Sequence, residues 1–247
     1  MWGEVIAQAD KLLQLVADSP PKESFEIQPA QAHIAGMFWR SRRLYEGVLI
    51  LLKAELPEEA AILARSLFEE SLRLQQLAAE PENRDGLILG WANNSINQQR
   101  GLLHTAKACG LDPDISATLT ILEKRRRDLD QYGARQGVKR RPSFQTRRDA
   151  AFRFERKEDF WLYEWSHESV HGSEAAWLFS SRRPAEGILG LYAKANDPEL
   201  LSEFARFAAR SMANAAEAAF AILGWTPVPD FQRPVTDIER LIDSDAG

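Results

Sequence analysis

The sequence has almost no cysteine and no long apolar run. Its single cysteine, Cys109, has no partner within the chain, which excludes an internal disulfide and favours a reducing compartment. No run approaches the roughly 20 apolar residues that cross a bilayer. The first residues also lack the basic and apolar segments of a signal peptide. We therefore predict a cytoplasmic protein that makes no membrane contact.

Convincing strand patterns are absent as well, because nearly every long segment repeats its apolar residues at the helical period. Prolines and glycines, such as Pro57 and Gly110, stand where these segments begin or end. The prediction is an all-α fold, a single-domain helical bundle of about six to eight helices over residues 1–225. An extended Pro-rich tail is predicted for residues 226–247. The predicted helical segments are 4–16, 29–54, 57–77, 81–110, 114–132, 143–152, 157–170, 174–179 and 198–223, with a last turn at 237–242.

Charge is unevenly distributed along the chain. The net charge is −5, yet residues 124–157 hold thirteen basic and four acidic residues, a local charge of +9. Such a segment can form a surface that attracts anions, but it can equally be solvated or paired with acidic residues elsewhere. The residues that we predict to contact nucleic acid are Arg125, Arg126, Arg140, Arg141, Arg147 and Arg148.

Histidine is scarce, and two of the four histidines stand in residues 164–173. On a helix, His167 and His171 project from one face, one turn apart, with Glu164 and Glu168 beside them. His167-Glu168-x-x-His171 matches the pattern in which two histidines bind zinc and the glutamate is a general base. A metal-dependent hydrolase with Zn held by His167, His171 and Glu164 is therefore one alternative.

The surrounding residues weaken this zinc alternative. The extended zincin pattern needs glycine and histidine at positions where the chain has Glu174 and Trp177. Two Glu-x-x-His units also occur in tandem, but a di-iron bundle needs one such unit on each of two helices. Our primary prediction is that the protein holds no metal and no other cofactor.

Two segments carry a resemblance to a known family. Residues 63–69 read Leu-x-Arg-Ser-Leu-x-Glu, and residues 163–173 begin with tyrosine and end with Val-His-Gly-Ser. Together they resemble a bacterial helical family catalogued as domain of unknown function 5677, over roughly residues 40–220. The resemblance supplies no activity, but it implies that six residues form one site. These residues are Arg65, Glu69, Tyr163, His171, Gly172 and Ser173.

The leading functional hypothesis joins this site to the basic segment. Metal-independent helical ribonucleases of the HEPN type use an arginine and a histidine on RNA, although their usual short Arg–His spacing does not occur here. Arg65 can stabilise a phosphorane, and His171 can move protons near neutral pH. We therefore hypothesise a self-associating protein of bacterial stress or phage defence that binds, and in an enzymatic form cleaves, a phosphate-bearing ligand such as RNA. The candidate catalytic residues are His171, Arg65, Glu69, His167, Glu168, Tyr163 and Ser173.

A non-catalytic interaction module is the remaining alternative. In that case His171 is a buried histidine bonded to Glu69 or Tyr163, and Arg65 pairs with a carboxylate to fix helix register. The site hypotheses share one geometric expectation, because buried charges need partners. Arg65 or Glu69 should lie within hydrogen-bond reach of His171 or Tyr163.

Overall fold

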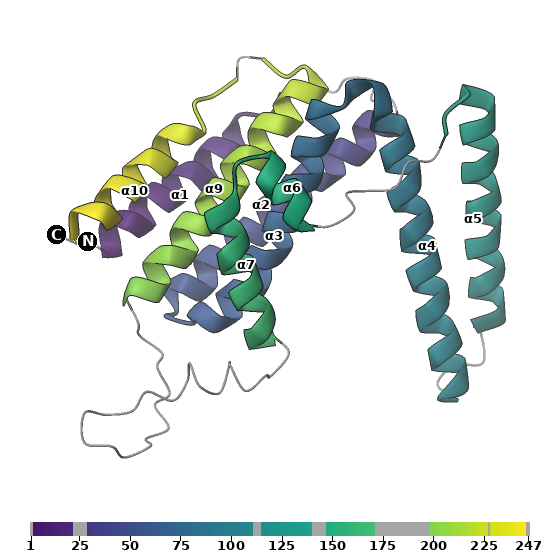
Figure 1. Cartoon of the computed structure of the whole chain (residues 1–247), viewed down its shortest axis with the longest axis horizontal. Coiled ribbons are helices and arrows are strands. Elements are labelled where there is room, and N and C mark those ends of the chain that lie inside the picture. The colour runs from purple at the N-terminus through teal and green to yellow at the C-terminus, as the bar shows by residue number, and fades with distance from the viewer. Residues whose placement is uncertain are drawn as a thin grey trace. The chain divides into compact units, whose positions relative to one another are not determined.

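A computed structural model describes residues 2–21, 29–110, 115–139, 147–170, 198–226 and 228–245 (Figure 1). Every regular element within these ranges is a helix, which confirms the predicted all-α class. The α-helices are α1 (Trp2–Asp18), α2 (Pro29–Lys53), α3 (Pro57–Ala79), α4 (Arg84–Ala108), α5 (Ile115–Gln136), α6 (Arg147–Arg153), α7 (Lys157–Val170), α9 (Pro198–Leu223) and α10 (Gln232–Asp245), and a 3-10 helix, η1, covers Pro81–Asn83. The helix predicted at 174–179 lies outside the described residues, as do residues 143–146 of the helix predicted at 143–152.

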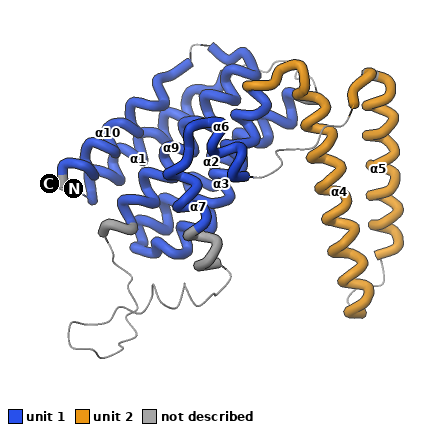
Figure 2. Tube along the Cα trace, viewed as in Figure 1, with its two compact units in different colours: residues 1–78, 147–247 blue, residues 79–146 orange. Residues whose placement is uncertain are grey.

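The chain divides into two compact units (Figure 2). Unit 1 comprises residues 1–78 and 147–247, and unit 2 comprises residues 79–146. Unit 1 therefore contains α1, α2, α3, α6, α7, α9 and α10, whereas unit 2 contains η1, α4 and α5. The single domain predicted over residues 1–225 stays a prediction, since two compact units can belong to one folding domain.

The core of unit 1 forms around α9. Helix α2 packs along α9, and α1 and α10 lie side by side and both contact α9 (Figure 1). The α9 surface is rich in small buried residues, which allow close approach of neighbouring helices. These are Ala205, Ala208, Ala209, Ala213 and Ala216. Phe220 of α9 meets Phe38 of α2 and Phe231 edge to face, so aromatic rings close one end of this core.

The C-terminal segment differs from its prediction. Residues 226–247, predicted as an extended tail, contain the helix α10, which buries Val235 and Ile238 and contacts α1 and α9. The prolines suggested an extended chain, but Pro234 falls in the first turn of α10. A proline there loses no helical hydrogen bond, because the first N–H groups of a helix have no intrahelical acceptor.

Two helix junctions in unit 1 share one geometry. Glu55 and Glu155 have φ values of 59° and 57°, the left-handed region that glycine usually fills at helix ends. The next residue donates back to the preceding helix, Leu56 N to Leu51 O at 2.9 Å and Arg156 N to Ala151 O at 2.7 Å. The carbonyl of Arg156 then accepts from Phe160 N at 3.0 Å in α7. This junction directs the Arg156 side chain into the core, where it is 4% exposed.

Unit 2 is a pair of helices, α4 and α5, that lie side by side. Its buried apolar residues include Leu87, Leu89 and Leu122, and Arg100 of α4 pairs with Glu123 of α5 at 3.2 Å. The run Lys124–Arg127 on α5 is exposed. In the parts of the chain that the structure describes, no helix is both long and apolar enough to cross a membrane.

Candidate functional site

Helix α3 provides the centre of the candidate site. Arg65, Glu69 and Arg73 follow one another at four-residue spacing, so they share one face of the helix. The adjacent residues Leu67 and Phe68 are fully buried. The apolar side of α3 therefore fixes the helix in unit 1, and its charged face is held towards α6 and α7.

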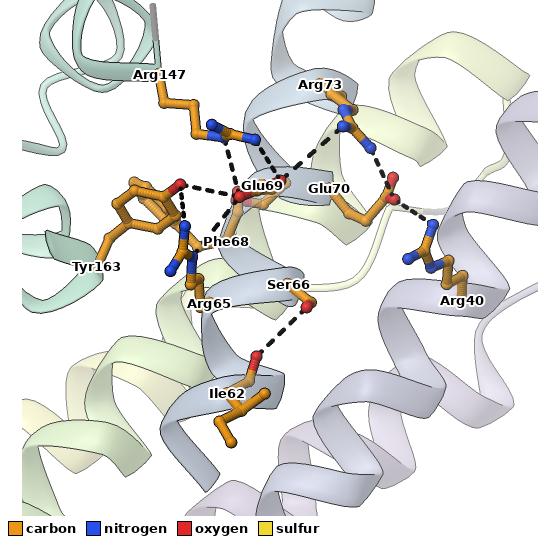
Figure 3. Close-up of polar contacts among 11 residues, drawn as sticks. Arg40, Ile62, Arg65, Ser66, Phe68, Glu69, Glu70, Arg73, Arg147 and Tyr163 are labelled. Atoms are coloured by element: carbon orange, nitrogen blue, oxygen red, sulfur yellow. Dashed lines mark hydrogen bonds and ion pairs between the residues drawn. The ribbon is translucent and has the colours of Figure 1, made fainter. Parts of the chain in front are cut away.

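The Glu69 carboxylate lies among three guanidinium groups and one hydroxyl (Figure 3). Its Oε1 accepts from Tyr163 Oη at 2.9 Å and forms an ion pair with Arg147 Nε at 2.9 Å, and its Oε2 accepts from Arg147 Nη2 at 3.3 Å. Arg65 Nε lies 3.9 Å from Oε1, and Arg73 Nη2 lies 4.0 Å from Oε2. We call these five residues, Glu69 with Arg65, Arg73, Arg147 and Tyr163, the Glu69 cage.

Tyr163 of α7 connects the cage to the core. Its hydroxyl accepts from Arg65 Nη2 at 3.1 Å, and the Arg65 guanidinium lies 4.6 Å from the ring centroid, a cation–π contact. Burial raises the pKa of Tyr163, and the charge of Glu69 and the hydrogen bond to it raise the pKa further, whereas Arg65 and Arg147 lower it. Because the pKa is raised overall, the phenol stays protonated at neutral pH and acts as a donor to Glu69.

A second carboxylate lies beside the cage on α3. Glu70 is 3% exposed and pairs with Arg73 Nη1 at 3.1 Å and with Arg40 Nη1 of α2 at 2.8 Å (Figure 3). Arg73 is thus shared between Glu69 and Glu70. Together the four arginines and two glutamates leave two positive charges. The side chains of Arg40 and Arg147 are 57% and 56% exposed, so the positive excess faces solvent.

Arg156 is a buried residue that the sequence analysis counted only as part of the basic segment. Its guanidinium donates to Asp159 Oδ2 at 2.6 Å, to Ser71 Oγ at 2.7 Å and to Ser211 Oγ at 2.8 Å. We call Arg156, Asp159, Ser71 and Ser211 the Arg156 hub, which joins α3, α7 and α9. Burial lowers the pKa of Arg156, and Asp159 opposes this by its charge and hydrogen bond. The spacing from Arg156 to Asp159, three residues at the start of a helix, was the only signal in the sequence.

The hub and the cage touch through two aromatic rings. The Arg156 guanidinium lies 4.6 Å from the centroid of the Phe68 ring, and the Phe68 ring centroid is 5.5 Å from that of Tyr163. Phe160 stacks on Tyr163 with centroids 5.8 Å apart. The Tyr163 ring is therefore fixed by neighbours on two elements, and its hydroxyl is preorganised to face Glu69.

The expected contact between the two signature segments is confirmed for Arg65, Glu69 and Tyr163, which two hydrogen bonds connect. His171, Gly172 and Ser173 lie outside the described residues. The side chains of His167 and Glu168 also lie outside them, although α7 reaches Val170. Glu164, the third zinc ligand of the alternative, is exposed on α7. The catalytic and zinc hypotheses that use these residues stay predictions.

The predicted nucleic-acid-binding arginines fall into different environments. Arg147, predicted to contact nucleic acid, is paired with Glu69 through one hydrogen bond and one ion pair. Arg148 is exposed and lies over the Phe152 ring at 5.3 Å. Arg125 and Arg126 are exposed on α5 in unit 2, and Arg140 and Arg141 lie outside the described residues. Only Arg147 of this set reaches the cage among the described residues, because α6 places it over the carboxylate of α3.

Comparison with known proteins identifies a family and nothing closer. No curated protein and no solved structure matches the chain. A family described as a family of unknown function matches residues 31–182, a range that contains both signature segments and the whole Glu69 cage. The chain belongs to this family of unknown function, DUF5677.

Proposed function

We propose that the protein binds a phosphate-bearing ligand such as RNA through the Glu69 cage. The observation that carries the proposal is the two-point contact of Arg147 with both oxygens of Glu69. An arginine fork of this kind fits a phosphate as well as a carboxylate, since both present two oxygens at similar spacing. The cage thus already has the geometry of an oxyanion receptor, with Glu69 as its internal anion.

The charge and exposure of the surrounding groups support the same proposal. Four arginines face two glutamates, and the side chains of Arg40, Arg73 and Arg147 are more exposed than those of both glutamates. Tyr163 adds a neutral donor that is preorganised by its packing. A phosphate that approaches from solvent therefore meets Arg147 before it meets the less exposed Glu69.

The basic run of unit 2 supports binding of a polyanion rather than a small phosphate. Lys124, Arg125, Arg126 and Arg127 are all exposed on α5. Such runs attract the backbone of nucleic acids without regard to sequence and make the affinity depend strongly on salt. RNA is for this reason our preferred phosphate-bearing ligand.

Cleavage is the enzymatic form of the proposal. Arg65 would stabilise charge on a reacting phosphate, and His171 would transfer a proton. His171→Ala should then leave RNA affinity unchanged and abolish cleavage. A cleavage rate unchanged by this substitution would remove His171 from the reaction while leaving the binding proposal intact.

The binding proposal is tested with a labelled single-stranded RNA over a series of salt concentrations. Arg147→Ala should weaken binding by about tenfold or more, since charge-assisted hydrogen bonds are worth about 1.5–3 kcal/mol. Arg240→Ala is the matched control, because Arg240 is 76% exposed and pairs only within α10, with Asp237 at 3.4 Å, among the contacts described. Absence of RNA affinity at low salt would contradict the proposal, as would equal losses in the two variants.

A further inference from the structure

The Glu69 carboxylate, which occupies the centre of the cage, restricts which phosphate can bind there. Glu69 presents one negative charge and two oxygens to Arg147 and Tyr163. Any anion that enters must take these donors from Glu69. Its binding free energy is therefore the difference between its own contacts and those that Glu69 gives up.

Internal and terminal phosphates differ in how much binding free energy they gain by replacing Glu69. A phosphodiester carries one negative charge and two free oxygens, as a carboxylate does, so replacing Glu69 with a phosphodiester gains little. A phosphate monoester has a second pKa near 6 and is close to a dianion at neutral pH, with three free oxygens. The third oxygen and the second charge can be met by the guanidinium groups of Arg65 and Arg73, which lie 3.9 and 4.0 Å from the carboxylate that they now share.

The two neighbouring glutamates are suited to different tasks. Glu70 is 3% exposed and is held by Arg40 and Arg73, so it keeps these arginines in place. Glu69 has a side chain that is 20% exposed, and its closest cation, Arg147, is 56% exposed. When Glu69 turns away, Glu70 still anchors Arg73, and Phe68 and Phe160 still hold Tyr163. The receptor can therefore exchange its anion without losing its shape.

We infer that the Glu69 cage recognises a terminal phosphate, a phosphomonoester dianion at the end of an RNA, in preference to internal phosphodiesters, and that Glu69 is the internal competitor that either phosphate must displace. The inference rests on the proposed function and names the part of the ligand that enters the cage.

The test compares two short single-stranded RNAs of identical sequence, one with a 5′-phosphate and one with a 5′-hydroxyl. At a pH above the second phosphate pKa of about 6, the wild-type protein should bind the phosphorylated RNA about tenfold more tightly. Glu69→Gln removes the competing charge at nearly constant size, so it should strengthen the binding of both RNAs. Asp237→Asn makes the same charge change in an exposed pair of α10 and should alter neither affinity.

A competition experiment on the wild-type protein covers the case in which Glu69→Gln does not fold. Inorganic phosphate should displace the phosphorylated RNA, and dimethyl phosphate, a monoanionic diester, at equal ionic strength should not. Equal affinity for the two RNAs, with both still weakened by Arg147→Ala, would overturn the inference and leave the proposed function standing. Absence of binding by either RNA at low salt would overturn both.

Discussion

The Arg156 hub and the Glu69 cage are two solutions to the placement of arginine between the same helices, α3 and α7. In each, a guanidinium lies 4.6 Å from an aromatic ring, Arg156 over Phe68 and Arg65 over Tyr163. The hub and the cage have opposite arrangements of charge. In the hub one buried cation is surrounded by acceptors, whereas in the cage one carboxylate is surrounded by cations.

This difference separates a structural site from the site that we propose to bind a ligand. The Arg156 guanidinium donates a hydrogen bond from each of its three nitrogens and Arg156 is 4% exposed, so an external anion has no access to it. In the cage, three arginines and Tyr163 share the Glu69 carboxylate, and Arg147 is exposed. The buried hydrogen bonds of the Arg156 hub contribute to the stability of the fold. The exposed arginine of the Glu69 cage is, in our proposal, a source of affinity for a ligand.

The largest effect should follow from breaking the hub. Arg156→Met keeps much of the side-chain volume but leaves Asp159 buried with only Arg210, at 3.1 Å, as a described ion-pair partner. We expect a loss of about 3–5 kcal/mol in the free energy of unfolding, measured with urea, because removing one partner of a buried ion pair is costly. Arg148→Met, an exposed arginine of α6, should change it by less than about 0.5 kcal/mol. Similar values for the two variants would show that the hub is not structural.

The next largest effect on the free energy of unfolding should come from the two neighbouring glutamates of α3, and it should differ between them. Glu70→Gln should cost about 1.5–3 kcal/mol, because a buried carboxylate loses its charge beside Arg40 and Arg73. Glu69→Gln should cost clearly less, since solvent screens its more exposed contacts. Paired urea unfolding curves provide the comparison. A larger loss for Glu69→Gln would make Glu69 a structural anchor and count against its exchange with a ligand.

The hydroxyl that links Arg65 to Glu69 should have a smaller effect on stability. Tyr163→Phe retains the packing of the ring on Phe68 but removes both hydrogen bonds. We expect a loss of about 0.5–1.5 kcal/mol in unfolding free energy, as for one partly buried hydrogen bond. Tyr132→Phe on α5, where the tyrosine is 38% exposed, is the control and should be nearly neutral. Equal effects would mean that the Tyr163 hydroxyl gains nothing from its position.

The smallest expected effect on stability comes from Glu155, at the helix junction that directs Arg156 into the core. Glu155→Gly should stabilise the protein by about 0.5 kcal/mol, because a residue other than glycine is disfavoured at a φ of 57°. Glu55→Gly tests the same geometry at a φ of 59° between α2 and α3. Thermal unfolding of both variants should show a small rise in Tm. A fall in Tm for both would show that these glutamates contribute interactions that outweigh the backbone strain.

The sequence predicted most of the helices because their ends carry local signals. Pro57 begins α3, and Gly110, with a φ of 69°, follows α4, as their residue types require. The α10 helix was predicted only as a last turn at 237–242, because prolines in general favour extended chain, and only a place in the first turn makes one compatible with a helix. Pro234 shows that the position of a proline matters as much as its presence.

The candidate site was predictable only in part. Family resemblance grouped Arg65, Glu69 and Tyr163, which are distant in sequence, and no periodicity could have done so. The roles of Arg147 and Arg156 were hidden, because both stand in a run of basic residues that looks uniformly exposed. The pairing of Arg147 with Glu69 and the burial of Arg156 depend on how α6 and α7 pack against α3, and the sequence alone does not give this packing.

The split of unit 1 into residues 1–78 and 147–247 has a consequence for synthesis on the ribosome. Helix α2 ends at Lys53, and its main neighbour α9 begins at Pro198. At roughly 5–20 residues per second, the apolar face of α2 waits on the order of ten seconds for its partner. During that time the α4–α5 pair, whose contacts are local, can already form, while Phe38 lacks its contact with Phe220 of α9. The nascent chain is thus most vulnerable to aggregation, and most in need of a chaperone, just before α9 is complete.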